Sequence, residues 1–347
     1  MQILITGGAG FIGSHLADQL IEEGHRVRAL DVLAEQVHGS GATRPDYLHQ
    51  EVELIRGDVR DAAAVRRAVE GVDAVFHFAA AVGVGQSMYE VEEYTSINTL
   101  GTAVLLETLI ESPVRRLIVA SSMSIYGEGM YRSADGAVVH GRERSSEQLR
   151  RGDWNVRDDN GMVLTPMPTA ETKVPSLASV YALSKFDQER LCLMLGGAYG
   201  IPTVALRFFN VFGTRQALSN PYTGVLAIFA SRLLNGRSPV IFEDGLQQRD
   251  FVSVHDVVRA CQLALHSDRA AGLAINIGSG RAYTVSEVAV MLASVLGRDE
   301  PPEICGKYRV GDIRHCFADI SLARRTLGYE PQVMLEDGIV ELAAWLG

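Results

Sequence analysis

Short apolar runs of strand length alternate with stretches of helical periodicity along the first 210 residues. The apolar runs that we predict to be strands are residues 2–6, 25–31, 53–58, 74–80, 116–122 and 203–209. The intervening segments that we predict to be helices are residues 14–23, 61–70, 92–111 and 180–195. The run 74–80 is almost continuously apolar, which is typical of a parallel strand covered by helices on both faces. The alternation therefore predicts parallel β-α-β units.

The pattern changes in two later parts of the chain. Residues 130–173 are polar and lack periodicity, and a structureless stretch of this length inside a compact domain tends to be functional or mobile. Either several of its side chains face a ligand or a partner, or the stretch is a solvated excursion; those side chains are His140, Arg150, Arg151 and Trp154. Beyond residue 210, helical segments and shorter apolar runs, among them a strand at 274–277, indicate a smaller mixed lobe.

A glycine-rich turn directly follows the first predicted strand and opens the first predicted helix. Gly7 permits a tight turn, Gly10 leaves room for a pyrophosphate beside the backbone, and Gly13 lets the helix pack closely on the strand. The N-terminus of the helix then presents free N–H groups and a partial positive charge to the phosphates. Glycine-rich turns also occur as ordinary connections, but the position between strand and helix favours a dinucleotide site.

Asp31 ends the second predicted strand, about twenty residues beyond the glycine turn, where a carboxylate accepts hydrogen bonds from an adenosine ribose. Its negative charge disfavours a 2′-phosphate, and no arginine immediately follows it. We therefore predict NAD rather than NADP, the alternative being an aspartate in a plain loop. Candidate ligand-binding residues follow several strands, at the edge where parallel sheets bind ligands: Gly10, Asp31, Asp58, Ala80 and Ser122.

These observations predict an α/β fold, namely a Rossmann-type doubly wound parallel sheet with a smaller mixed α/β C-terminal substrate lobe. Residues 1–175 form the NAD-binding domain, into which the polar excursion at about 130–173 is inserted. Residues 176–347 supply the helix at 180–195 and the last strand of the sheet, followed by the interleaved substrate lobe.

Composition excludes several classes of protein. The net charge of −10 over 347 residues argues against a general surface for nucleic acid or an anionic membrane. The cysteines form no C-x-x-C pair, so we expect reduced thiols and no bound metal; they are Cys192, Cys261, Cys305 and Cys316. No apolar run reaches the ~18 residues of a membrane span, and the N-terminus lacks the basic region of a signal peptide. We predict a cytoplasmic location.

Tyr181 and Lys185 are four residues apart on a predicted helix and therefore share one face. A free tyrosine titrates near ~10, which makes it a weak base at neutral pH. A lysine ammonium and an oxidised nicotinamide both favour the phenolate and lower this pKa, so that Tyr181 can remove a proton from a sugar or alcohol hydroxyl. Ser122, at the end of the fifth strand, is expected to hydrogen-bond the same oxygen. The pattern Y-x-x-x-K is common by chance, and its weight comes from its place after Ser122.

Ten segments of the chain share an order with one large enzyme family. They are TGGAGFIG (6–13), Asp31, GDVRD (57–61), HFAA (77–80), NTLGT (98–102), SSMSIYG (121–127), YALSK (181–185), RFFNVFG (207–213), RDFVSV (249–254) and RVGD (309–312). In these segments the chain resembles the extended short-chain dehydrogenase/reductases, in the nucleotide-sugar epimerase/dehydratase group. The resemblance covers nearly the whole chain apart from residues 130–173. It implies a tightly held NAD, a Ser-Tyr-Lys triad and a nucleotide-diphosphate sugar under the smaller lobe.

The resemblance assigns roles to individual residues. The implied catalytic residues are Ser122, Tyr181 and Lys185. The implied NAD-binding residues are Gly7, Gly10, Phe11, Ile12, Asp31, Asp58, Val59, Phe78, Ala79, Ala80, Asn98, Ser121, Tyr181, Lys185 and Phe208. The implied substrate-binding residues are Ser122, Ser124, Asn210, Arg249, Arg309 and Asp312. Among them, Arg249 and Arg309 are expected to pair with the diphosphate, because a guanidinium fork suits phosphate oxygens.

The residues after Ser122 bear on the reaction. Related dehydratases and decarboxylases place acidic residues there, whereas this chain has Met123, Ser124 and Ile125. This favours a 4-epimerase, in which the C4 hydroxyl is oxidised to a 4-keto sugar and re-reduced on the opposite face. The alternatives are a 4,6-dehydratase or a UDP-glucuronate decarboxylase, and a non-catalytic dinucleotide-binding sensor.

Two downstream segments narrow the expected substrate. Residues 216–236 and 307–321 resemble a subgroup of 4-epimerases acting on dTDP-L-rhamnose, so we expect that sugar or a UDP-hexose as the substrate. Similar sequences often carry cysteine pairs in the excursion, and this chain has none between residues 130 and 173.

The resemblance also implies a homodimer. The predicted helices around residues 98–111 and 180–195 would pack against their copies as a four-helix interface. The alternative is that both helices simply flank the sheet.

Overall fold

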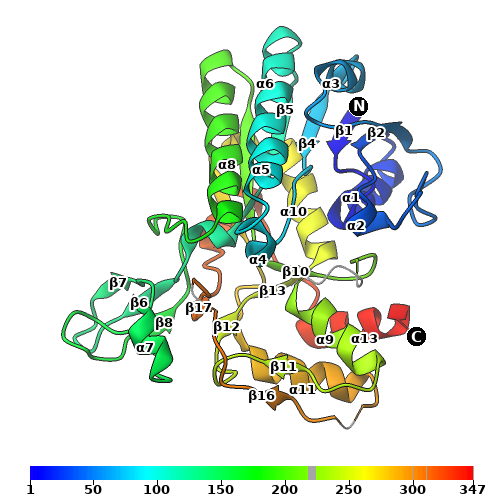
Figure 1. Cartoon of the computed structure of the whole chain (residues 1–347). Helices are drawn as coiled ribbons and strands as arrows, with labels where there is room; N and C mark the ends of the chain where they lie inside the picture. Colours follow the sequence, from blue (N-terminus) through cyan, green and yellow to red (C-terminus); the bar gives the residue numbers. More distant parts are fainter. Residues whose placement is uncertain (218–223, 299, 310, 347) are drawn as a thin grey trace.

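A computed structural model describes residues 1–217, 224–298, 300–309 and 311–346. Residues 218–223, within one of the segments that resemble the dTDP-L-rhamnose subgroup, and Val310 of RVGD lie outside the described residues. The predicted fold class is confirmed: a seven-stranded parallel sheet carries helices on both faces, with a smaller lobe beneath it (Figure 1).

The order of the strands across the sheet is β14-β9-β5-β4-β1-β2-β3. Their bounds are β1 (Gln2–Thr6), β2 (Arg26–Asp31), β3 (Glu53–Arg56), β4 (Ala74–His77), β5 (Arg116–Ser122), β9 (Thr203–Phe208) and β14 (Ala274–Ile277). Each neighbouring pair is parallel. The run at 274–277 therefore completes the main sheet beside β9, instead of belonging to the smaller lobe as the sequence suggested. Local sequence cannot show which sheet a short apolar strand joins.

Two buried clusters hold the helices on the sheet. The side chains of β1 alternate, so that Ile3 and Ile5 belong to one cluster with Leu16, while Leu4 belongs to the other with Leu105. The first face is covered by α1 (Phe11–Glu22), α10 (Val254–His266) and α12 (Ser321–Leu327), and the second by α3 (Ala62–Val69), α6 (Gly101–Glu111) and α8 (Val180–Tyr199). The strict alternation of a pleated strand thus gives one sheet two apolar faces.

The predicted helix 92–111 is not a continuous α-helix. It begins as α5 (Val91–Tyr94), passes through a π-helical segment, η1 (Thr95–Leu100), and continues as α6. The remaining short helices of this half are α2 (Glu35–His38), α4 (Val84–Ser87) and the 3-10 turns η2 (Met123–Tyr126) and η3 (Asp268–Ala270). A π-helical turn often lies at a functional position, and this one contains the predicted cofactor ligand Asn98.

The polar segment 130–173, called the insert from here on, is folded. It contains α7 (Ser146–Arg150) and an antiparallel sheet of β6 (Met130–Arg132), β7 (Val138–His140) and β8 (Thr165–Met167). Tyr131, Val156 and Leu164 form its own small core. The expectation of a stretch without regular structure was wrong, because strands of three residues are too short to show a period in the sequence. In Figure 1 the insert projects to one side, beside β12 and β17.

The smaller lobe is built around three helices, α9 (Val225–Leu234), α11 (Val285–Val295) and α13 (Leu335–Leu346), which share one apolar cluster. Short strands connect it to the sheet domain and the insert: β10 (Asn210–Phe212), β11 (Val240–Ile241), β12 (Gln248–Arg249), β13 (Phe251–Ser253), β15 (Tyr283–Thr284), β16 (Glu303–Ile304) and β17 (His315–Cys316). Strand β12 lies between β15 and β17, which places Arg249 beside the segment that follows Arg309.

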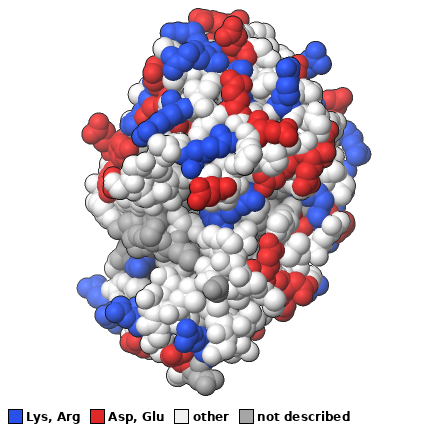
Figure 2. Space-filling model, turned by 90° about the vertical axis from the view of Figure 1, so that its right-hand side faces the viewer, with Lys and Arg blue, Asp and Glu red and all other residues white. Residues whose placement is uncertain are grey.

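Charges are mixed on the surface. On the face shown in Figure 2, Lys and Arg side chains are interspersed with Asp and Glu and do not form one continuous basic area. Among the described residues, no helix is both long and apolar enough to cross a membrane.

Candidate active site

The glycine turn after β1 leaves no room for side chains at two of its glycines. Gly7 adopts φ +71°, and a Cβ there would lie 2.9 Å from the Ala79 nitrogen. A Cβ on Gly13 would lie 2.4 Å from the Gly7 oxygen, so only glycine lets α1 pack this close to the strand. Gly10 precedes α1, and no side chain caps the N-terminus of this helix. The first-turn N–H groups around Phe11 and Ile12 therefore remain available to a phosphate.

Asp31 stands at the end of β2 and is almost fully buried. Its carboxylate accepts hydrogen bonds from the backbone nitrogens of Ala9 (3.0 Å) and Leu33 (2.9 Å), so it braces the glycine turn as well. Tyr47, which sequence reasoning missed, donates its hydroxyl to the Ala9 oxygen at 3.0 Å. Because a carboxylate can accept several hydrogen bonds, the ribose contact of Asp31 stays compatible with this brace and stays a prediction.

The neighbouring strand ends carry the other predicted cofactor residues. Asp58 accepts hydrogen bonds from the backbone and guanidinium of Arg60, and these bonds lower its pKa. Val59 is buried against Gly101, where a Cβ would lie 2.5 Å from its side chain. After β4, Phe78, Ala79 and Ala80 are partly exposed, and the two alanines suit a backbone that lies close to a ligand.

Asn98 lies in the π-helical turn and is fully buried. Its Oδ1 accepts from the Ala81 nitrogen at 2.7 Å, and its Nδ2 donates to the Ser184 hydroxyl at 2.9 Å and the Ala81 oxygen at 3.1 Å. Asn98 thus ties the loop after β4 to α8. Its contact with the cofactor stays a prediction, and the structure shows it chiefly as a brace for the site.

Ser122 and Tyr181 are brought together at the carboxyl end of β5. Ser179 caps α8 through a hydrogen bond from the Ala182 nitrogen, and the Tyr181 nitrogen donates to Ser87 Oγ at 3.0 Å. Burial raises the pKa of Tyr181, while a hydrogen bond with Ser122 acts in the opposite direction. Without a cofactor, the tyrosine is therefore a weaker acid than in water. The phenolate that the chemistry needs requires further positive charge next to the ring.

Lys185, the predicted cation, is almost fully buried. Burial lowers its pKa from 10.5 to about 8, and its Nζ donates to Gln188 Oε1 at 2.6 Å. Gln188 in turn donates to Thr102 Oγ1 at 2.9 Å, and His77 Nε2 lies 2.8 Å from the same oxygen. The Thr102 hydroxyl also donates to the Asn98 carbonyl, and Gln188 Nε2 lies 3.2 Å from His77 Nε2, so these side chains form one buried network.

This network was missed from the sequence. His77 occurs in the HFAA segment, and burial lowers its pKa to about 3, so it is neutral and serves as a hydrogen-bonding spacer. Gln188 follows Lys185 by three residues, a helical spacing that could have identified it.

Two further predicted residues lie beneath the site. Ser121 donates to Glu189 Oε2 at 2.6 Å, and Arg207 binds both oxygens of the same carboxylate. Phe208 is buried with its ring edge-on to Phe78, at 6.1 Å between centroids. These contacts fix the end of β9 against β5 and α8.

The predicted substrate residues approach the site from the smaller lobe. Asn210 Oδ1 is buried without a hydrogen-bond partner, which is compatible with an absent ligand. Arg249 donates to the carbonyls of Ile313 and Arg314. Arg309 and Asp312 are exposed, and the Arg309 guanidinium lies over the Phe242 ring at 4.6 Å.

Gly311 and Asp312 lie near the start of α8. The Asp312 nitrogen donates to the Arg309 oxygen, and a Cβ on Gly311 would lie 3.6 Å from the Ala178 oxygen. Ser124, beyond β5, bonds the Ser122 hydroxyl at 3.0 Å, so two hydroxyls stand side by side next to Tyr181. Phosphate-binding and catalytic candidates thus meet at one edge of the sheet.

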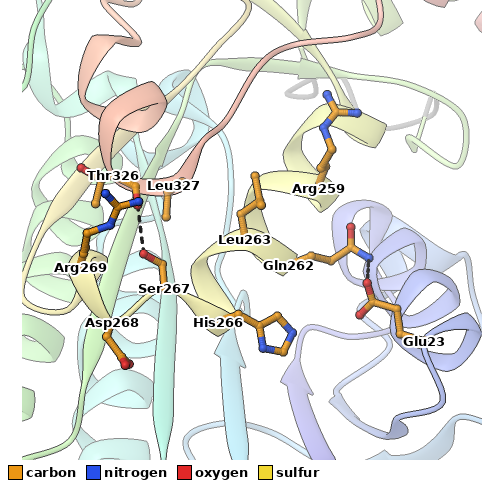
Figure 3. Close-up of a pocket in the computed structure, with 10 residues that line it drawn as sticks. All are labelled: Glu23, Arg259, Gln262, Leu263, His266, Ser267, Asp268, Arg269, Thr326 and Leu327. Carbon is orange, nitrogen blue, oxygen red and sulfur yellow. Dashed lines mark hydrogen bonds between the residues drawn. The ribbon is translucent and has the colours of Figure 1, made fainter.

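A cavity of about 540 Å³ lies elsewhere, between the ends of α1 and α10 (Figure 3). In Figure 3, Gln262 reaches Glu23, with a hydrogen bond of 2.7 Å, and His266 points into the same space. Glu23, His25 and His266 bring possible metal-ligand atoms within 4.8 Å of one another, but His25 Nδ1 already bonds the Met1 amino group. None of the predicted catalytic or cofactor residues lines this cavity. The expectation of no bound metal stays a prediction.

Comparison with known proteins decides the family. Residues 3–146 and 161–278 match the NAD dependent epimerase/dehydratase family. The chain belongs to this family. It is 36% identical to a dTDP-L-rhamnose 4-epimerase of Burkholderia thailandensis over 350 residues, which cover 99% of this chain and 94% of the relative.

Two further members of the family show its range. The crystal structure of UDP-glucuronic acid 4-epimerase from Bacillus cereus, in complex with UDP-glucuronic acid and NAD, superposes with a TM-score of 0.82. It is 27% identical, and the match covers 100% of this chain and 99% of that chain. A dTDP-glucose 4,6-dehydratase of Actinoplanes is 29% identical over 99% of this chain and 97% of the relative.

Proposed function

We propose that this protein is an NAD-dependent 4-epimerase of a nucleotide-diphosphate sugar. The observation that carries the proposal is the pair Ser122–Tyr181 with a second hydroxyl, that of Ser124, where family dehydratases are expected to place an acid. The turn η2 that follows Ser122 contains no carboxylate. Without an acid at this position, chemistry at a second sugar carbon has no proton donor or acceptor from this turn.

The residues of the chain fit NAD by shape as well as by family. The uncapped N-terminus of α1 and the two glycines that exclude a Cβ suit a pyrophosphate, and Asp31 suits a ribose. When bound, NAD supplies a hydride acceptor that returns the hydride, so the reaction has no net redox change. The cofactor therefore has no need to leave between turnovers.

In this proposal Tyr181 removes the proton of the sugar C4 hydroxyl and later returns a proton to the C4 oxygen. Ser122 holds the same oxygen by a hydrogen bond. Lys185 contributes positive charge to the site, and its ammonium donates a hydrogen bond to Gln188. The diphosphate is bound by Arg249, Arg309 and Asn210. This binding keeps the nucleotide in place while the 4-keto sugar rotates to present its opposite face.

The substrate that we propose is dTDP-L-rhamnose or a UDP-hexose, because the relative with 36% identity bears the first of these activities in its name. The test is to incubate the purified protein with dTDP-L-rhamnose, UDP-glucose or UDP-glucuronate without added reductant and to identify products by NMR. Conversion of one sugar into its C4 epimer is the expected result. If none is converted, the proposal fails for these substrates. A stable keto sugar or released carbon dioxide would instead indicate a dehydratase or a decarboxylase.

We further propose that two copies of the chain form a homodimer through α6 and α8. Both helices lie side by side on one face of the sheet (Figure 1), and several apolar side chains on or near them are about half exposed: Met88, Leu100, Leu183 and Met194. Light scattering should give twice the mass of the chain, and Leu183→Glu should give single chains. A single-chain mass for the unmodified protein would refute this interface. We also propose a cytoplasmic location, which the free thiols of the four cysteines support.

A further inference from the structure

One part of the insert is buried against the smaller lobe, near the predicted substrate residues, and is not exposed to solvent. Arg144, an arginine that sequence reasoning did not single out, has a side chain only 2% exposed. Its Nη1 donates to Glu243 Oε1 in the smaller lobe at 2.8 Å, and its Nη2 donates to the Asp312 carbonyl at 2.8 Å. One guanidinium therefore joins three regions that are far apart in the sequence.

The carboxylate of Glu243 also binds Arg314, which follows Asp312 by two residues. Glu243 Oε2 accepts from Arg314 Nη1 at 2.9 Å, and Arg314 further binds both oxygens of Asp244. Glu128, at the entry to the insert, accepts from the Arg314 nitrogen at 2.6 Å. The backbone and the side chain of Arg314 are both fixed, and the charges of the two arginines are matched by buried carboxylates.

Arg144 and Arg249 act on consecutive carbonyls. Arg144 binds the carbonyl of Asp312, and Arg249 binds the carbonyls of Ile313 and Arg314. Arg249 and Asp312 are predicted substrate residues, whereas Arg144 comes from the insert. The position of the Arg249 guanidinium thus depends on a backbone that the insert holds from its other side.

An aromatic residue of the insert, Trp154, contacts the chain a few residues before Asp312. The Trp154 ring lies 6.2 Å from the Tyr308 ring, next to Arg309, and the Trp154 carbonyl accepts from Arg144 at 3.2 Å. Trp154 is half-buried by this contact. Tyr308 and Asp312 are therefore both in contact with the insert.

We infer that the insert is a clamp that positions the described residues of segment 308–314, the proposed diphosphate-binding segment, with Arg144 as its positioning residue. This inference rests on the proposed function, which assigns the diphosphate to Arg249 and Arg309. The role explains why a polar, irregular stretch carries one fully buried arginine. In this role Arg144 affects the affinity for the nucleotide. It does not affect the chemistry at Tyr181, which the insert does not contact.

The decisive variant is Arg144→Lys. Lysine keeps the positive charge among Glu128 and Glu243, so the buried carboxylates stay neutralised, but one ammonium cannot reproduce the fork between Glu243 and Asp312. The matched control is Arg142→Lys, because Arg142 lies in the same insert in an exposed ion pair with Asp159. The probes are dTDP and UDP, with Kd measured by titration calorimetry on the full chain with its bound NAD.

Arg144→Lys should weaken binding of the preferred diphosphate by about 10-fold or more, because charge-assisted hydrogen bonds to the segment are lost. KM for the sugar nucleotide should rise in parallel while kcat stays within about 3-fold and the bound NAD is unchanged. Arg142→Lys should match the unmodified protein. If Arg144→Lys does not fold, Trp154→Leu decides, with an expected weakening of about 3-fold.

Two results would overturn the inference. One is a folded Arg144→Lys protein, or Trp154→Leu in its place, that binds dTDP and UDP as the unmodified protein does. The other is an unmodified protein that binds neither diphosphate. The proposed function fails separately: a protein that binds a diphosphate through Arg144 but epimerises no sugar supports the clamp and refutes the epimerase.

Discussion

The cofactor side and the substrate side of the site are held together by different forces. On the cofactor side, the turn from Gly7 to Gly13 is fixed by steric exclusion and backbone hydrogen bonds, and Asp31 reaches it from only 22 residues away. On the substrate side, Arg144 and Glu243 meet across 99 residues through a buried ion pair. The comparison teaches that the two predicted phosphate sites are held in place by unrelated means. One is a rigid backbone, and the other is a segment held by charged side chains.

Tyr181 stands where the two sides meet, and its loss should have the largest effect. Tyr181→Phe removes the proton-transfer group and should lower kcat by about 100-fold or more, while NAD remains bound. The measurement is a turnover assay together with quantification of NAD released on denaturation. Full activity would exclude Tyr181 as the base, and loss of NAD would show that the ring is needed for the cofactor side instead.

Gly7→Ala tests whether steric exclusion shapes the cofactor side. The new Cβ would lie 2.9 Å from the Ala79 nitrogen at φ +71°, and strain of about 1–3 kcal/mol corresponds to roughly 5- to 150-fold weaker NAD binding. The control is Gly24→Ala, which has a similar φ of +80° but nothing within 4 Å of its Cβ. Equal NAD content in both variants would contradict the proposal that steric exclusion at Gly7 shapes the NAD-binding turn.

Arg249→Met tests the substrate side alone. Loss of the guanidinium should raise KM for the sugar nucleotide about 10-fold, since bonds to charged groups contribute about 1.5–3 kcal/mol. NAD content should not change, because Arg249 contacts the segment 313–314 and not the glycine turn. A fall in kcat at unchanged KM would place Arg249 in the chemistry and not in binding.

Lys185 gives the smallest effect, through pH. Its folded pKa of about 8 lies below the ordinary 10.5, so between these values the unfolded chain binds more protons and the free energy of unfolding rises with pH. This contribution should amount to about 2 kcal/mol between pH 8 and pH 10, and it should be missing in Lys185→Met. Urea unfolding measures it, with the exposed Lys307→Met as control. If the free energy of unfolding changes with pH by the same amount in the unmodified and Lys185→Met proteins, burial does not lower the pKa of Lys185.

Several elements could be predicted because their signals are local. Strands β1 to β5 and helix α8 follow from periodicity, and the turn at Gly7 follows from the absence of side chains. The proximity of Ser122 and Tyr181 follows from their places at a strand end and a helix start. The insert could not be predicted, because its three strands have three residues each and its core consists of Tyr131, Val156 and Leu164.

By itself, the sequence determined the parallel sheet and predicted the dinucleotide turn and the candidate residues for the chemistry, because glycine sterics and residue periodicity act over a few positions. Only the tertiary structure decided that β14 completes the sheet, that Lys185 donates to Gln188, and that Arg144 donates to the Asp312 carbonyl. These are contacts between distant segments. Their free energy depends on burial and on which charges meet, and neither is written in any local pattern.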